Sequence, residues 1–120
     1  MLHDREFLFD LLRTPSPTGF ETPGQRVWAR YVAPLADEVA SDAYGNVWAR
    51  LAAAAGGAPT LMLEAHADEI GFMVKYVTDD GFLHIDRIGG SDTAIARGKR
   101  VRILGASGEI LGVTGGRPLP

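Results

Sequence analysis

The sequence predicts an α/β chain in two parts, and three observations support this prediction. Two amphipathic helical stretches come first, a short apolar run follows at 60–66, and two hairpins with glycine at their corners follow after that. The composition also changes after Glu69, where alternating strand patterns begin. We therefore predict two helices with a mixed sheet over residues 1–69, and part of a β-barrel-like, β-rich module over residues 70–120.

Composition excludes several classes of protein. The chain has 120 residues, 46% of them hydrophobic, which is enough to bury one core. Its net charge of −3 comes from interspersed charges, so no nucleic-acid partner is expected. There is no run of about 18 apolar residues, so no membrane span is expected, and the acidic first residues do not resemble a signal peptide.

The chain has no cysteine. This excludes disulfides and thiolate metal sites and permits a cytoplasmic location. Any metal ion must therefore be held by histidine, aspartate, glutamate or water.

Two helices are predicted near the start of the chain. Asp4 can cap the first, which ends before the proline-containing segment 14–19. The second is predicted to begin with Thr22 as N-cap, Pro23 at its first position and Gln25 at its third, the pattern of a capping box. Its apolar stripe is expected in the core and comprises Val27, Trp28, Tyr31, Val32 and Leu35.

Strands are predicted from alternation and from the turn residues between them. The apolar run 60–66 is interpreted as a central strand that follows a small-residue loop at 52–59. Segment 94–98 is ambiguous. The predicted hairpins pair 38–42 with 46–51, 71–78 with 82–87, and 100–104 with 109–114.

The most informative polar residues lie at the end of the predicted central strand. Side chains two apart on a strand share a face, so Glu64, His66 and Asp68 are expected on one side and Leu61 and Leu63 on the other. The H-x-D spacing alone favours a simple interpretation, a half-buried histidine with a surface ion pair. The chemical alternative is that His66 is a zinc ligand and Asp68 accepts the proton of its other ring nitrogen.

Other titratable residues are interpreted as structural. His3 precedes the first helix and is expected to be solvated. His84 is expected on the exposed, polar face of its strand. The Asp79-Asp80 pair is assigned to a turn, because aspartate tolerates turn geometry.

Six stretches of the sequence carry a family resemblance. They are PSPTGFE (15–21), DAYGNVWA (42–49), EAHADEIGFMV (64–74), DDGFLHIDRIGG (79–90), RGKRVRI (97–103) and GEILGVTGG (108–116). Together they resemble the beginning of the glutamyl and deblocking aminopeptidases, some of which have been labelled endoglucanase M or cellulase M. The stretches occur in the family's order and cover nearly all of the chain.

The resemblance implies a dinuclear metallopeptidase that removes N-terminal residues from peptides with two divalent ions, zinc or cobalt, and forms tetrahedral homo-oligomers. His66 matches the family's first metal ligand, and Asp68 matches the carboxylate of the catalytic site that supports it. Glu64 stands where the family usually has a small residue. Residues 1–69 would open the catalytic domain, and residues 70–120 would begin an inserted domain used in subunit assembly.

The remaining ligands of the family lie further along its longer chains. The resemblance therefore implies that these 120 residues are an N-terminal fragment or truncated product that is inactive alone. An alternative function is a non-catalytic, β-rich interaction module, since the edge strands of an incomplete sheet have unpaired backbone groups that can bond to another chain. A carbohydrate-cleaving activity finds little support, because no spaced acid and nucleophile pair is evident.

Overall fold

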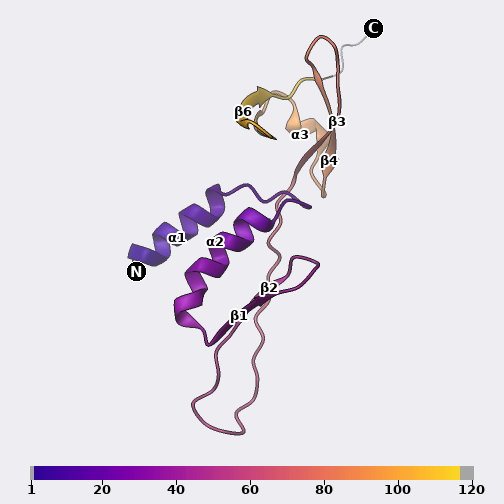
Figure 1. Ribbon diagram of the computed structural model, residues 1–120. Coiled ribbons are helices and arrows are strands. Elements are labelled where there is room, and N and C mark those ends of the chain that lie inside the picture. Colours follow the sequence, from indigo (N-terminus) through magenta and orange to yellow (C-terminus); the bar gives the residue numbers. More distant parts are fainter. Residues whose placement is uncertain (1, 117–120) are drawn as a thin grey trace. The chain divides into compact units, whose positions relative to one another are not determined.

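The computed structural model describes residues 2–116, without the side chains of residues 2, 3 and 93. The predicted solvation of His3 therefore lies outside the described residues. The chain divides after Glu69 into two compact units, each of which is described by itself. Figure 1 shows helices in the first unit and mainly strands in the second, which confirms the predicted α/β class.

The first unit begins with two contacting helices, α1 (Leu2–Arg13) and α2 (Thr22–Val32), followed by the short 3-10 helix η1 (Ala33–Leu35). The ring of Phe7 stacks on that of Tyr31, with centroids 3.7 Å apart and planes 8° from parallel. The Tyr31 hydroxyl also donates a hydrogen bond to Asp4 Oδ1 at 2.6 Å. These contacts hold the predicted helices together.

The predicted capping box of α2 is wrong. Glu21 occupies the N-cap position in a helical conformation and makes no side-chain cap, so Thr22 is already inside the helix. Gln25 instead donates from Nε2 to the carbonyl oxygen of Gly45 at 3.2 Å. The Gln25 side chain therefore bonds to the following hairpin and not to the N-terminus of α2, where the capping-box pattern had placed it.

The hairpin of β1 (Glu38–Ser41) and β2 (Val47–Arg50) is confirmed and antiparallel. Asp42 organises its turn, because its carboxylate accepts hydrogen bonds from the amides of Tyr44 and Asn46 and from Asn46 Nδ2. These bonds, led by the one from the Asn46 side chain, hold the pKa of Asp42 below its usual value. Gly45 takes a positive φ of 87°, which favours glycine at that corner.

The predicted central strand at 60–66 is not formed within the described chain. Leu61, Met62 and Leu63 are 81%, 77% and 87% exposed, and the expected alternation of a buried and a polar face is absent. A strand requires a hydrogen-bonded neighbour, and the described residues supply only an isolated parallel bridge between Pro17 and Glu69. The predicted mixed sheet is thus reduced to this bridge and the β1–β2 pair.

The second unit consists of two confirmed hairpins joined through a short helix. The hairpins are β3 (Gly71–Val77) with β4 (Leu83–Ile88), and β5 (Arg100–Gly105) with β6 (Gly108–Val113). The helix α3 (Thr93–Ala96) overlaps the start of the ambiguous segment 94–98. It begins after Asp92, whose Oδ1 atom accepts a hydrogen bond from the amide of Ala94 at 2.8 Å. A bulge interrupts the β3–β4 register between Val74 and Tyr76.

The expected hydrophobic core is not found among residues 4–92 and 94–116, where no apolar side chain is fully buried. The α2 stripe is half-buried at best, and Leu35 is 62% exposed. Two-stranded sheets need a facing layer to bury a core, and the three two-stranded sheets of the described chain leave many large apolar side chains exposed. Within the described part of the chain, no helix is both long and apolar enough to cross a membrane.

Candidate functional site

The structure brings His66 and Asp68 together at the end of the first unit. His66 Nδ1 lies 3.0 Å from Asp68 Oδ1 and 2.9 Å from the carbonyl oxygen of the same residue. The His66 side chain is 86% exposed, whereas that of Asp68 is 38% exposed. The imidazole therefore projects into solvent while one edge is held by its neighbour.

This geometry determines which ring nitrogen of His66 carries a proton. Both oxygens at Nδ1 are acceptors, a backbone carbonyl and a carboxylate, so Nδ1 must be the donor. In the neutral imidazole the lone pair is then on Nε2, the nitrogen directed away from these contacts. Histidines that bind metal usually donate their other ring N–H to a carboxylate or carbonyl in this way, so the geometry fits a metal ligand as well as it fits a surface ion pair. The exposure of His66 shows that the half-burial expected by the simpler interpretation is wrong.

Asp68 is itself held by a residue that is distant in sequence. The hydroxyl of Thr18 donates to Asp68 Oδ2 at 2.6 Å, the length of a charge-assisted bond. The hydrogen bond from Thr18, followed by the one from His66, keeps the pKa of Asp68 below its usual value. The carboxylate is therefore ionised at neutral pH and can accept from both sides.

Two further contacts join the same segments. The amide of Ser16 donates to Glu69 Oε1, and the amide of Glu69 donates to the carbonyl oxygen of Ser16, each at 2.9 Å. Together with the Thr18–Asp68 bond, these contacts form what we call the clasp, made by residues 16–18 and 68–69. Sequence reasoning did not find the clasp, because nothing in a single sequence pairs positions about 50 residues apart.

The donors of this site fit part of a metal centre. His66 offers Nε2, and Asp68 and Glu69 supply nearby carboxylates that are already engaged in hydrogen bonds. In the described residues, no group of three or more histidine, aspartate, glutamate or cysteine side chains is arranged to hold a metal ion. A zinc site takes about three protein ligands, so the side chains present fit one ligand and its support.

The other titratable residues singled out from the sequence lie outside this cluster. Glu64 is exposed in the extended segment before His66. His84 is exposed on β4, with its ring 5.9 Å from that of Tyr76. Asp79 and Asp80 occupy the β3–β4 turn, as predicted.

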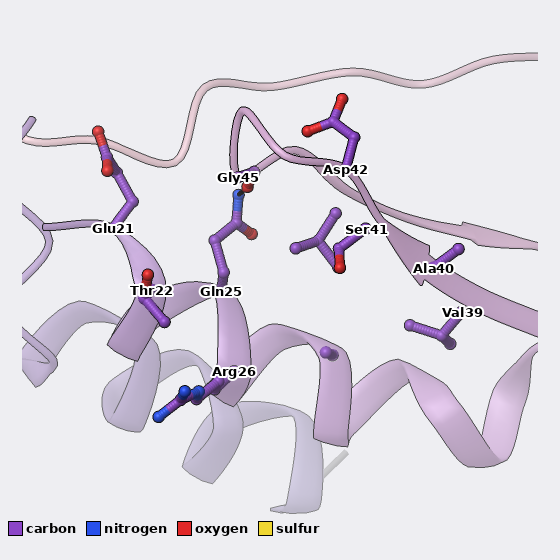
Figure 2. Close-up of a pocket in the computed structure, with 11 residues that line it drawn as sticks. Glu21, Thr22, Gln25, Arg26, Val39, Ala40, Ser41, Asp42 and Gly45 are labelled. Carbon is purple, nitrogen blue, oxygen red and sulfur yellow. Dashed lines mark hydrogen bonds between the residues drawn. The ribbon is translucent and has the colours of Figure 1, made fainter. Parts of the chain in front are cut away.

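A shallow hollow of about 410 Å³ lies between the start of α2 and the β1–β2 hairpin (Figure 2). Glu21, Gln25, Arg26 and Asp42 line it, together with apolar side chains of β1. The Gln25 amide is bonded to the hairpin and the Asp42 carboxylate to its own turn. The residues that line the hollow do not include His66 or Asp68, and its Gln25 side chain joins the helix to the hairpin.

Comparison with known proteins gives a consistent result. Residues 45–119 match the model of the M42 glutamyl aminopeptidase family. The chain is 36% identical over 118 residues to a lysyl aminopeptidase of Pyrococcus furiosus and 31% identical over 116 residues to a glutamyl aminopeptidase of Lactococcus lactis. These matches cover 96% and 92% of this chain but only 33% of each relative, so the chain spans about a third of their length.

Solved structures show the same partial coverage. A TET aminopeptidase of a marine sediment thaumarchaeon superposes with a TM-score of 0.88 at 28% identity, over 100% of this chain and 34% of its own. An endoglucanase of Thermotoga maritima gives a TM-score of 0.80 at 29% identity, over 91% and 33%. A TET peptidase of Pyrococcus horikoshii, described as assembling into a tetrahedron or a large octahedral shell, gives 0.79 at 29% identity, over 96% and 34%.

Proposed function

Because this chain belongs to the M42 glutamyl aminopeptidase family, we propose that it forms the opening third of a metal-dependent aminopeptidase that removes N-terminal residues from peptides. The observation that supports this most directly is the His66–Asp68 pair, with the carboxylate fixed on one ring nitrogen. We propose His66 as a metal ligand through Nε2, and Asp68 as the residue that sets its tautomer.

The roles of the residues follow from this geometry. Asp68 holds the proton on Nδ1 and so leaves the lone pair on Nε2, while the exposure of His66 leaves Nε2 accessible. Two divalent ions, zinc or cobalt, would polarise the scissile carbonyl and supply a hydroxide at neutral pH. Both the metal identity and the peptide substrate are part of this proposal.

We also propose that these 120 residues are inactive alone. His66 and its supporting carboxylate, Asp68, provide fewer ligands than one zinc ion needs. The rest of the site would come from sequence corresponding to the other two thirds of the relatives. The complete protein would act in the cytoplasm as a homo-oligomer, consistent with the shells described for its structural neighbour.

The test is a chimera in which these residues replace the matching third of the Pyrococcus furiosus relative, which is 36% identical here. Release of N-terminal residues from short peptides is measured after chelation and after addition of Zn²⁺ or Co²⁺. We expect metal-dependent release by the chimera, none by the 120-residue chain, and loss in the chimera with His66→Ala.

Glu64→Ala is the matched control, since Glu64 is exposed nearby and outside the pair. The proposal fails if the chimera assembles at the relative's mass and binds metal but releases nothing. It also fails if His66→Ala retains full activity. Robust metal-dependent turnover by the chain alone would overturn the proposed incompleteness of its site.

A further inference from the structure

We propose that Thr18 is a positioning residue of this site, acting through Asp68 on His66. The hydroxyl of Thr18 and the imidazole of His66 engage the two different oxygens of one carboxylate, at 2.6 Å on Oδ2 and 3.0 Å on Oδ1. This inference rests on the proposed function, in which His66 binds a metal ion. The hydrogen bonds that join Thr18, Asp68 and His66 are present without a metal.

The carboxylate needs this restraint because its own torsion is soft. Rotation about the terminal χ2 bond of aspartate has broad, shallow preferences, so backbone position alone does not aim Oδ1 at an imidazole. Asp68 is 38% exposed and follows a segment that, in the part of the chain that the structure describes, pairs with no strand. A strong donor on Oδ2 removes this freedom and selects the orientation that serves His66.

Thr18 can serve as a restraint because the clasp places its backbone. Pro17 and Glu69 form a parallel bridge, and Ser16 and Glu69 exchange two hydrogen bonds beside it. The proline-containing segment after α1 therefore lies against the metal-ligand segment at a defined register. The clasp thus fixes residues 68 and 69 although residues 60–66 pair with no strand among the described residues.

The first test reads the tautomer of His66 by ¹⁵N–¹H correlation in the 120-residue chain at neutral pH without metal. The wild type is expected to carry its proton on Nδ1. Thr18→Val, which keeps the branched shape and removes the hydroxyl, should shift the proton population toward Nε2. Asp68→Ala should shift it in the same direction, and Thr18→Ser should restore the wild-type signal.

The second test is a double-mutant cycle on Zn²⁺ affinity, measured by calorimetry in the chimera that tests the proposed function, with His66→Ala as the reference for binding at this site. Thr18→Val should weaken binding about tenfold, as other supporting groups of metal ligands do. In the Asp68→Ala background the same change should have almost no effect, because there is no carboxylate left to orient. Thr14→Val is the matched control, since among the described residues the Thr14 hydroxyl donates to the Asp10 carbonyl at the end of α1 and not to the site.

The outcomes separate this inference from the proposed function. If Thr18→Val leaves the tautomer unchanged, or if Thr18→Ser is as impaired as Thr18→Val, Thr18 does not position Asp68. Equal losses of affinity with and without Asp68 would likewise show that Thr18 acts only on the fold. If His66→Ala leaves metal affinity unchanged, the proposed ligand is wrong, while the tautomer comparison still decides the role of Thr18.

Discussion

Replacing Gly24 by alanine should weaken the clasp. Gly24 is buried in the first turn of α2, where an added Cβ would lie 2.4 Å from Ser16 Oγ and 3.4 Å from Ser16 Cβ. The first distance is far shorter than a non-bonded contact, and Ser16 is itself only 7% exposed. We therefore expect the Ser16 backbone to move away from Glu69.

The expected magnitude follows from the contacts that would be lost. The two Ser16–Glu69 hydrogen bonds contribute about 1 kcal/mol each, whereas alanine returns about 1 kcal/mol over glycine inside a helix. The chain should therefore lose about 1 kcal/mol of unfolding free energy. Local opening at Glu69 should become easier by about 2 kcal/mol, or roughly 30-fold in amide exchange.

Hydrogen exchange at the Glu69 amide, read by NMR, measures the loss directly, and urea unfolding measures the net effect. Ser16→Ala provides the matched background, because it removes the oxygen that the new methyl group would strike. In that background Gly24→Ala should stabilise the chain by about 1 kcal/mol. Unchanged exchange at Glu69 in the single variant would refute the reasoning, since the Ser16 hydroxyl would then have rotated away without moving the backbone.

Three further predictions concern charge and exposed apolar surface. The pKa of Asp68 is lowered from 3.8 in the folded chain, so the ionised carboxylate stabilises the fold. This stabilisation should be complete above pH 3.8 and should be lost as the pH falls through the lowered pKa. The pH dependence of the carboxyl ¹³C shift of Asp68 measures the lowered pKa. The pKa of Tyr31 is raised from 10.0, first by its hydrogen bond to Asp4, so Asp4→Ala, which removes the acceptor, should lower the pH at which Tyr31 ionises. Ultraviolet absorbance against a Tyr31→Phe blank checks this, and equal titration curves for the wild type and the variant would show that the bond is absent in solution. Met62 is 77% exposed in an apolar run, so Met62→Lys should raise, by several-fold, the concentration at which the chain begins to aggregate. Light scattering measures this concentration, and an unchanged value would show that the run around Met62 does not drive aggregation.

The hairpins were predicted correctly because their signals are local. Gly45 and Gly81 take φ values of 87° and 82°, and the alternating segments beside them have partners only a few residues away. The helices were predicted from periodicity for the same reason. The capping box failed because Gln25 has a tertiary partner, Gly45, which lies 20 residues further along the chain.

The central strand could not be predicted from its composition alone. Leu61, Met62 and Leu63 have the residue types of a buried strand, but burial and pairing depend on neighbours. Within the described residues those neighbours are not supplied, and the run stays extended and exposed. A local pattern expresses what a segment can form, whereas its partners decide what it does form.

The sequence by itself determined the class of the fold, the helices and the three hairpins, because these depend on residues near one another in the chain. It also placed His66 beside Asp68, but through a strand at 60–66 that the described chain does not form. Only the tertiary structure decided that Thr18 holds the other oxygen of Asp68 and that Ser16 pairs with Glu69. These contacts join positions 50 and 53 residues apart. No spacing rule links such positions, because their proximity results from the path of the intervening helix, hairpin and extended segment.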